Sequence, residues 1–454
     1  MGRQSDDAST ISGAEAGRAP EPDPAAVLVS RRFLAVLVLS AVVGVVASLA
    51  AWCFLELIHY VQVWVFTDIP RGLGLEPTPK WWYLPVLALA GLITAFAVAR
   101  LPGRGGHVPV HGLDPTPTAP VALPGVLLAG LASVGLGVVL GPEAPLIALG
   151  GGLGFLLVGR IRRETPPELG TLIAASATFA ALSFLFGSPI IAAVILLEAA
   201  GLDRRRMPLL LVPGLMAAGI GSLVAIGMGA WTGVNMAAIT LGTLPLPSFA
   251  RPTVVDFLWT VAFALVVTVG CLVVFGVGRR VERVMKDRTL VILPVVGVMI
   301  AVLAVAFSYL TDKGVDQVLF SGQDAMGPLI SDAATWSLGA LALLIAFKGL
   351  AYSLSLGKLR GGPVFPAMFL GAAAGLMAAS LPGYDLSPAV AVGIGAAVAT
   401  TLRLPLAAVV LATLLCAPAG TGVEPLIIVG VVVAYLTTLA VEARVKARAP
   451  EPVG

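Results

Sequence analysis

Long apolar runs separated by short polar stretches make up most of the chain. The first extends from about Phe33 to Trp64. A helix needs about 20 apolar residues to cross the hydrocarbon core of a bilayer, so these runs predict membrane helices. Several are cut by glycine and proline, and two are too long for one span, which predicts an all-α polytopic membrane protein with tilted and partly re-entrant helices. The further runs are 83–100, 121–158, 171–200, 207–229, 254–277, 290–310, 335–356, 364–381, 388–416 and 425–442.

One run contains a single carboxylate. Glu143 is the only ionisable side chain between Val121 and Val158, and it lies between Pro142 and Pro145. A charge at the centre of a membrane segment costs about 2.5–3.5 kcal/mol on insertion scales, so an intramembrane carboxylate is a functional candidate. Proline is tolerated in the first turn of a helix, which predicts that a helix begins here. Its free N–H groups would form an anion site at membrane depth.

This motif occurs twice. The segment from Gly141 to Gly154 matches the segment from Gly362 to Gly375 in its Gly, Pro and Leu positions, at an offset of 362 − 141 = 221 residues. Pro189 and Pro405 begin a second pair of similar segments, at an offset of 405 − 189 = 216. Paired apolar segments broken by Gly and Pro are typical of inverted-repeat transporters, whose half-helices meet near the midplane. We therefore predict repeats at about 83–229 and 290–442.

Composition and charge agree with a membrane protein. Of the 454 residues 58% are hydrophobic and 12% charged, whereas soluble domains carry about 25% charged residues. The basic residues gather at the ends of apolar runs, which places them in the cytoplasm by the positive-inside rule and gives no reason to expect nucleic-acid binding. These clusters are Arg31-Arg32, Arg160/Arg162/Arg163, Arg204-Arg205-Arg206, Arg279/Arg280/Arg283/Lys286/Arg288 and Arg444/Lys446/Arg448.

The same signals divide the chain into three parts. Residues 1–30 are rich in Pro, Ala and acidic residues and predict a disordered cytoplasmic tail. Residues 31–445 form the membrane transport domain, and 446–454 form a short cytoplasmic tail. We expect an integral protein of the plasma (inner) membrane, surrounded by the lipid bilayer, with both termini in the cytoplasm.

These motifs resemble those of the CLC family of chloride channels and proton-coupled chloride transporters. Gly141-Pro142-Glu143-Ala144-Pro145 is similar to the family's Gly-x-Glu-Gly-Pro, and Gly362-Pro363-Val364-Phe365-Pro366 to its Gly-x-Phe-x-Pro. Gly105-Gly106-His107-Val108-Pro109 is the nearest match to its Gly-Ser-Gly-Ile-Pro. The resemblance covers about residues 30–445. It implies the CLC type of inverted-repeat fold and a homodimer with one anion pathway in each subunit.

The resemblance also implies site residues. Glu143 matches the family's gating glutamate, which competes with the anion and can carry a proton. No cofactor or metal is expected apart from chloride as the bound ion. The predicted anion-binding residues are Gly106, His107, Val108, Gly141, Ala144, Val364 and Phe365.

Three departures from the family pattern bear on the transport mechanism. Gly106 stands where the family has a chloride-coordinating serine, and no aromatic residue lies among 444–449, where the coordinating tyrosine would fall. Ala199 occupies the position of the inner proton-relay glutamate. Glu198 beside it is either a proton relay or a partner of the arginines at 204–206. We therefore expect pH-sensitive anion transport and leave open whether it is coupled to protons.

Several alternatives remain at this stage. The transported anion could instead be nitrate or fluoride, because the serine is missing. His107, His111, Asp114 and Glu143 have residue types suited to an intramembrane metalloenzyme, although Pro109 prevents one regular helix face. A membrane scaffold without transport would leave the repeated half-helices unexplained. Lys348, inside an apolar run, either reaches an interface or serves the site.

Overall fold

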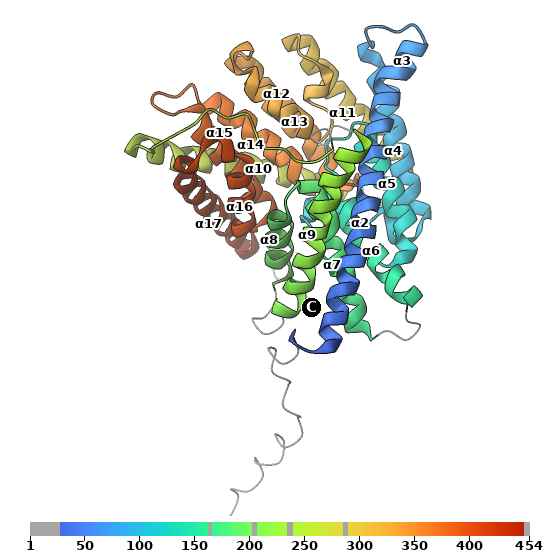
Figure 1. The fold of residues 1–454 in the computed structure, drawn as a ribbon. Helices are drawn as coiled ribbons and strands as arrows, with labels where there is room; N and C mark the ends of the chain where they lie inside the picture. Colours follow the sequence, from blue (N-terminus) through green and yellow to red (C-terminus); the bar gives the residue numbers. More distant parts are fainter. Residues whose placement is uncertain (1–27, 162–165, 202–206, 234–238, 285–288, 449–454) are drawn as a thin grey trace, which may run out of the picture.

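The computed structural model describes residues 28–161, 166–201, 207–233, 239–284 and 289–448, which form helices joined by short connections (Figure 1). The helices are α2 (Arg31–Val63), α3 (Ile69–Gly72), α4 (Tyr83–Arg100), α5 (Leu123–Gly135), α6 (Glu143–Ile161), α7 (Pro167–Phe186), α8 (Pro189–Ala200), α9 (Met207–Thr232), α10 (Val254–Val284), α11 (Thr289–Thr311), α12 (Gln323–Ser331), α13 (Leu338–Lys358), α14 (Val364–Ala378), α15 (Leu386–Leu402), α16 (Pro405–Leu415) and α17 (Glu424–Arg448).

Within these residues, nine helical segments are long and apolar enough to cross a membrane. The first is longer than the sequence predicts, since α2 continues through a turn of π-helix and α3 to give 42 residues, Arg31–Gly72. The two apolar runs that are too long for one span are each broken in two. Residues 121–158 contain α5 and most of α6, and 388–416 contain most of α15 and all of α16.

Two groups of three helices pack together (Figure 1). Helices α2, α7 and α9 contact one another, and so do α10, α15 and α17. Between them α8 contacts α16, so the short helices that begin at Pro189 and Pro405 lie side by side. Helices α6 and α14 pack against α7 and α15 respectively.

The helices follow the same order in both halves of the chain. The starts of α6 and α14 differ by 364 − 143 = 221 residues, and those of α7 and α15 by 386 − 167 = 219. For α8 and α16 the difference is 405 − 189 = 216, and for α9 and α17 it is 424 − 207 = 217. The limits of the repeats at 83–229 and 290–442 stay predictions.

Small residues let α14 and α15 approach closely. A Cβ atom on Gly371 of α14 would overlap the main-chain carbonyl of Gly393 on α15, and a Cβ on Gly393 would overlap the carbonyl of Gly371. Without water between helices in a bilayer, such close backbone packing is a main source of helix association. These two glycines therefore fix the distance between α14 and α15.

We expect Gly371→Ala to destabilise the protein by about 1–3 kcal/mol, because the added methyl group forces α14 and α15 apart. Thermal unfolding of the purified protein in detergent measures the effect. Gly219→Ala on α9 is the matched control, since its Cβ would meet nothing within 4 Å. Equal unfolding temperatures for the two variants would show that the Gly371–Gly393 contact does not limit stability.

Candidate anion site

The starts of α6 and α14 meet inside the protein. The N–H of Gly141 donates to the carbonyl of Gly362 at 2.8 Å, and the N–H of Gly362 donates to the carbonyl of Gly141 at 2.6 Å. This pair of bonds joins the segments that lead into the two helices. The two copies of the Gly-Pro motif therefore converge on one place, as the repeat predicts.

The Glu143 side chain lies at this junction and is fully buried. Its Oε1 accepts a hydrogen bond of 2.9 Å from the N–H of Phe365, in the first turn of α14. Its Oε2 has no hydrogen-bond partner in the described part of the chain. A Cβ on Gly141 or Gly362 would overlap this carboxylate, so both positions need glycine for the close approach. The carboxylate thus occupies the positive end of α14, where an anion would bind.

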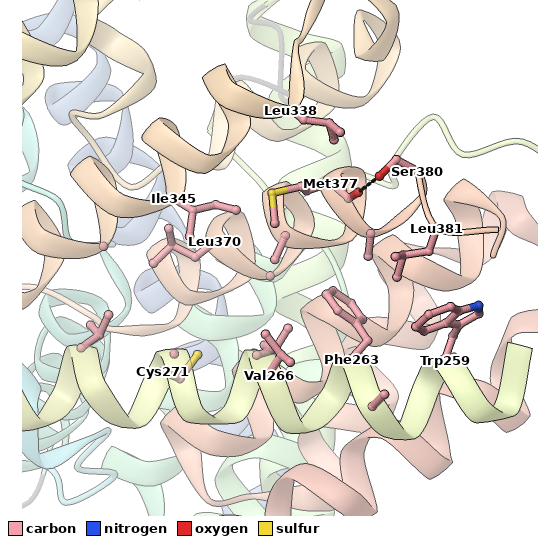
Figure 2. Close-up of a pocket in the computed structure, with 18 of the residues that line it drawn as sticks. Trp259, Phe263, Val266, Cys271, Leu338, Ile345, Leu370, Met377, Ser380 and Leu381 are labelled. Carbon is pink, nitrogen blue, oxygen red and sulfur yellow. Dashed lines mark hydrogen bonds between the residues drawn. The ribbon is translucent and has the colours of Figure 1, made fainter. Parts of the chain in front are cut away.

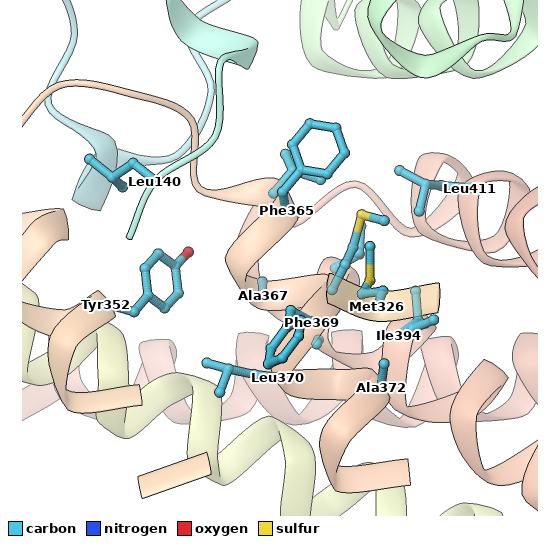
Figure 3. Packing of buried hydrophobic residues seen from close by; sticks show 14 of the residues in the cluster. Leu140, Met326, Tyr352, Phe365, Ala367, Phe369, Leu370, Ala372, Ile394 and Leu411 are labelled. Carbon is cyan, nitrogen blue, oxygen red and sulfur yellow. The ribbon is translucent and has the colours of Figure 1, made fainter. Parts of the chain in front are cut away.

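Tyr352 holds the start of α14 in place, although no pattern in the sequence singles it out. Its hydroxyl donates to the carbonyl of Pro363 at 2.6 Å, and its ring packs edge-on against Phe275 with centroids 6.1 Å apart. The ring of Phe365 stacks on Phe186 at 5.8 Å. Figure 3 shows Phe365 at the first turn of α14 and Tyr352 on the neighbouring helix α13. These contacts fix the N–H group that Glu143 accepts from.

Lys348 of α13 is buried inside the protein and does not reach an interface. Its ammonium donates to four consecutive main-chain carbonyls, and it lies 4.4 Å above the ring of Phe369 on α14. The carbonyls are those of Gln317, Val318, Leu319 and Phe320, at 3.1, 3.1, 2.9 and 3.4 Å. Lys348 on α13 therefore holds the segment before α12 against α13 and α14.

A cavity of about 300 Å³ adjoins the Glu143 turn. Three of the predicted anion-binding residues line it, namely Gly106, His107 and Ala144, whereas Val108 does not. The other three, Gly141, Val364 and Phe365, are buried at the helix junction. Gly361 and Arg360, which directly precede Gly362, form another part of the cavity wall.

The backbone at Gly106 explains why no serine stands there. Its φ is +89°, in the left-handed region that favours glycine, and a Cβ would lie 3.1 Å from a methyl group of Val126. A serine would need a different backbone conformation to place its hydroxyl in the cavity. The cavity is instead lined by a guanidinium and an imidazole, from Arg360 and His107.

Glu198 stabilises a helix terminus. Its Oε1 accepts from the N–H of Leu406 at 3.0 Å and its Oε2 from the N–H of Ala407 at 2.7 Å, both in the first turn of α16. The arginines at 204–206, which the sequence offered as partners, lie outside the described residues. The contacts that the structure shows are those of a carboxylate capping α16.

Glu198→Ala should therefore lower the free energy of unfolding by about 1–2 kcal/mol, the usual cost of removing a helix cap. Chemical unfolding in detergent measures this loss. Glu168→Ala, which removes an exposed carboxylate from the first turn of α7, serves as the control. A Glu198 variant as stable as the control would contradict the capping role.

A larger cavity of about 550 Å³ lies between α10, α13 and α14 (Figure 2). Its lining is apolar and includes Trp259, Phe263, Cys271, Leu338 and Met377, and none of its lining residues is charged. An ion would lose its hydration there without gaining polar partners. The smaller cavity next to Glu143 is therefore the candidate anion site.

The residues proposed for a metalloenzyme do not gather into a metal site. His107 Nδ1 lies 3.8 Å from Asp114 Oδ2, and His111 Nε2 lies 3.0 Å from Glu282 Oε1. In the described ranges no group of three or more His, Cys, Asp and Glu side chains could hold a metal ion. Glu143 faces the start of α14 instead.

Comparison with known proteins agrees with this fold. The family model described as "Voltage gated chloride channel" matches residues 109–439. The "Putative ion-transport protein YfeO" of Salmonella schwarzengrund is 28% identical over 341 residues, 74% of this chain and 78% of the relative. The protein of the same name from Salmonella paratyphi A is 28% identical over 344 residues, with the same two coverages.

Two solved structures share the fold. One is a CLC-type fluoride/proton antiporter, with a TM-score of 0.65 and 20% identity over 90% of this chain and 96% of the other. The second is a slow cyanobacterial Cl⁻/H⁺ antiporter, with a TM-score of 0.69 and 18% identity over 91% and 98%. The half-helices and the buried glutamate between them define a membrane protein that transports anions. The chain belongs to the voltage gated chloride channel (CLC) family, which confirms the predicted fold class and transport function.

Proposed function

We propose that the protein moves chloride, or a similar small monovalent anion, past Glu143, which acts as the gate. The observation that carries this proposal is the hydrogen bond from the Phe365 N–H to the Glu143 carboxylate, at the positive end of α14. A carboxylate in this place competes with a transported anion for the same N–H groups. The bound ion in this proposal is chloride, and no cofactor takes part.

Protonation of Glu143 supplies the gating step. A neutral carboxyl group is a weaker acceptor than a carboxylate, so its bond to the Phe365 N–H loosens when a proton arrives. An anion can then bind the N–H groups in place of the carboxylate. Its hydrogen bonds to them are weak enough that it can leave again. Proton release restores the carboxylate at α14 and closes the path.

Fluoride is the second candidate anion. One structural neighbour is a fluoride/proton antiporter and the other a Cl⁻/H⁺ antiporter, so the fold accommodates either ion. The guanidinium in the cavity wall, and the imidazole once it is protonated, are stronger donors than a serine hydroxyl, and fluoride is the stronger hydrogen-bond acceptor of the two ions. This feature of the cavity favours testing fluoride beside chloride.

Ion efflux from proteoliposomes tests the proposal. Vesicles are loaded with chloride, fluoride or nitrate, and efflux is recorded together with external pH, with protein-free vesicles as the control. We expect selective efflux of one halide that quickens as external pH falls. Efflux no faster than from protein-free vesicles for all three anions would overturn the proposed function.

We propose further that the protein is a homodimer in the plasma (inner) membrane with its termini in the cytoplasm. Arg31 and Arg32 at the start of α2 line one cavity together with Ile161 at the end of α6, so basic ends of two membrane helices lie on one side. The positive-inside rule makes this the cytoplasmic side. Accessibility of cysteines introduced at Arg31 and Arg71, on opposite ends of Arg31–Gly72, checks the orientation.

A further inference from the structure

Arg360 is a buried cation without a carboxylate partner. Its side chain is 5% exposed, and no ion pair forms between it and any carboxylate in the described part of the chain. Three main-chain carbonyls accept from its guanidinium: those of Lys358 at 2.7 Å, Leu359 at 3.4 Å and Arg104 at 3.1 Å. The Nε–H has no hydrogen-bond partner within the described ranges. Burying a charge is costly unless it is paired, so an anion bound beside Arg360 would stabilise its buried positive charge.

The Arg360 guanidinium lines the cavity beside the Glu143 turn. The position of a Cβ on Gly105, another wall residue, is 3.3 Å from Arg360 Nε, so the unpartnered donor lies next to the glycine loop. The main-chain N–H of Arg360 donates to Ser133 Oγ at 3.1 Å, and that hydroxyl is bonded to Thr94. The residue is therefore anchored at its backbone and at three guanidinium contacts, and the buried Nε–H is one of the two N–H groups left over.

His107 contributes a second unpartnered nitrogen to the same cavity. Its Nε2 is buried and has no hydrogen-bond partner among the described residues, whereas its Nδ1 is 3.8 Å from Asp114. Asp114 Oδ1 is already used by the N–H and the hydroxyl of Thr116, at 2.9 and 2.6 Å. With Nδ1–H turned toward Asp114, the neutral ring leaves a lone pair at Nε2. Protonation turns this atom into an N–H donor.

The other charged groups around His107 do not neutralise the cavity. His111, with its ring centroid 6.2 Å away, is bonded to Glu282 of α10 at 3.0 Å. Arg360 lies in the connection between α13 and α14, and its positive charge disfavours a second positive charge on His107. Burial is the largest influence and lowers the pKa of His107 below its ordinary value, while Asp114 acts in the opposite direction. The imidazole is therefore neutral at pH 7 until an anion offsets the cost of charging it.

We propose that in this cavity, the candidate anion site, Arg360 Nε–H and protonated His107 Nε2–H together bind one small monovalent anion, so that anion binding promotes protonation of His107. The proposal rests on the proposed function and adds a proton-binding group that lies apart from Glu143. Because linkage is reciprocal, the anion raises the proton affinity of His107 by the same factor by which the proton raises anion affinity. Arg360 supplies affinity at every pH, and His107 supplies its pH dependence.

Calorimetric titration of chloride into the full-length Glu143→Gln protein in detergent tests the site without the gate's own proton. We expect affinity to rise about tenfold from about pH 7.5 to about pH 5.5, as His107 charges. His107→Asn should remove this rise, and His59→Asn, which changes a histidine of α2 outside the cavity, should keep it. Arg360→Gln should weaken chloride binding about tenfold or more at both pH values, unlike Arg280→Gln on the exposed surface of α10.

A measurement without changes at Arg360 or His107 guards against misfolded variants. Chloride binding to the Glu143→Gln protein at about pH 6.5, repeated in buffers of different ionisation enthalpy, counts the protons taken up. We expect uptake of a fraction of one proton per anion. No uptake, or a pH-dependent affinity that survives His107→Asn, would overturn the linked site. Selective ion efflux from proteoliposomes would remain in that case, so the failure would not extend to the proposed function.

Discussion

Replacing Glu143 by glutamine is expected to remove the proton-dependent gate, so that anion flux rises and keeps only the weaker response to external pH that His107 gives to anion binding. Glutamine keeps the shape of the side chain and one oxygen that can accept from the Phe365 N–H. It loses the charge, and a neutral bond of about 0.5–1.5 kcal/mol replaces a charge-assisted one of about 1.5–3 kcal/mol. The equilibrium constant for the closed state then falls by about tenfold, so the path is open more of the time.

The measurement is anion efflux from proteoliposomes at several external pH values, with proton flux recorded in the same vesicles. Glu76→Gln is the matched control, because Glu76 is an exposed carboxylate paired with Arg71 outside the site. The control should keep the pH response of the unmodified protein. A Glu143→Gln protein that still moves protons against their gradient would show that the proton path avoids this residue.

The central junction could be predicted from the sequence because its signals are local. A lone carboxylate between two prolines marks Glu143, and the Gly-Pro motif returns at Gly362. In each copy, proline fixes a helix start and glycine permits close approach, so similar segments predict similar half-helices. The structure brings these two starts together through the paired hydrogen bonds of Gly141 and Gly362.

The rest of the site depends on contacts between distant parts of the chain. Arg360 reads as a basic residue that ends an apolar run, yet it is buried against the carbonyl of Arg104, 256 residues away. Glu198 stands close to arginines in the sequence, but the groups that it accepts from lie 208 and 209 residues further on. No spacing rule connects such pairs, because they form only when the two halves of the protein pack together.

The φ of +89° at Gly106 is a further feature that one sequence does not reveal. Alignment with the family motif places this glycine where the family has a serine, which suggests that a hydroxyl ligand is lost and that the anion site is weakened. The structure gives a different reason for the glycine, since the backbone there favours it. In our proposal the donors come from the neighbouring His107 and from Arg360, which the fold brings to the same cavity from a distant part of the chain.

Lys348→Met should have the largest effect on stability, lowering the free energy of unfolding by about 3–5 kcal/mol. Two contributions oppose each other here. Burying an ammonium is costly, so removing it gives back part of its desolvation energy. However, the carbonyls of residues 317–320 then lose their common donor inside the protein. Each buried acceptor left without a partner costs about 1–3 kcal/mol, so the buried carbonyls of Val318 and Leu319, together with the part-buried ones of Gln317 and Phe320, outweigh the gain.

Thermal unfolding in detergent measures this loss, with Lys313→Met as the matched control. Lys313 makes similar contacts in a more exposed place, donating to the Thr335 carbonyl at 3.1 Å and lying 4.7 Å from the Trp336 ring. Its loss should cost about 1 kcal/mol or less, because water replaces its contacts. Lys348→Arg separates charge from geometry: a planar guanidinium cannot point at four consecutive carbonyls as a compact ammonium does, so it should recover only part of the stability. If Lys348→Met unfolds at the same temperature as Lys313→Met, the carbonyls find other donors and the ammonium does not hold the connection before α12.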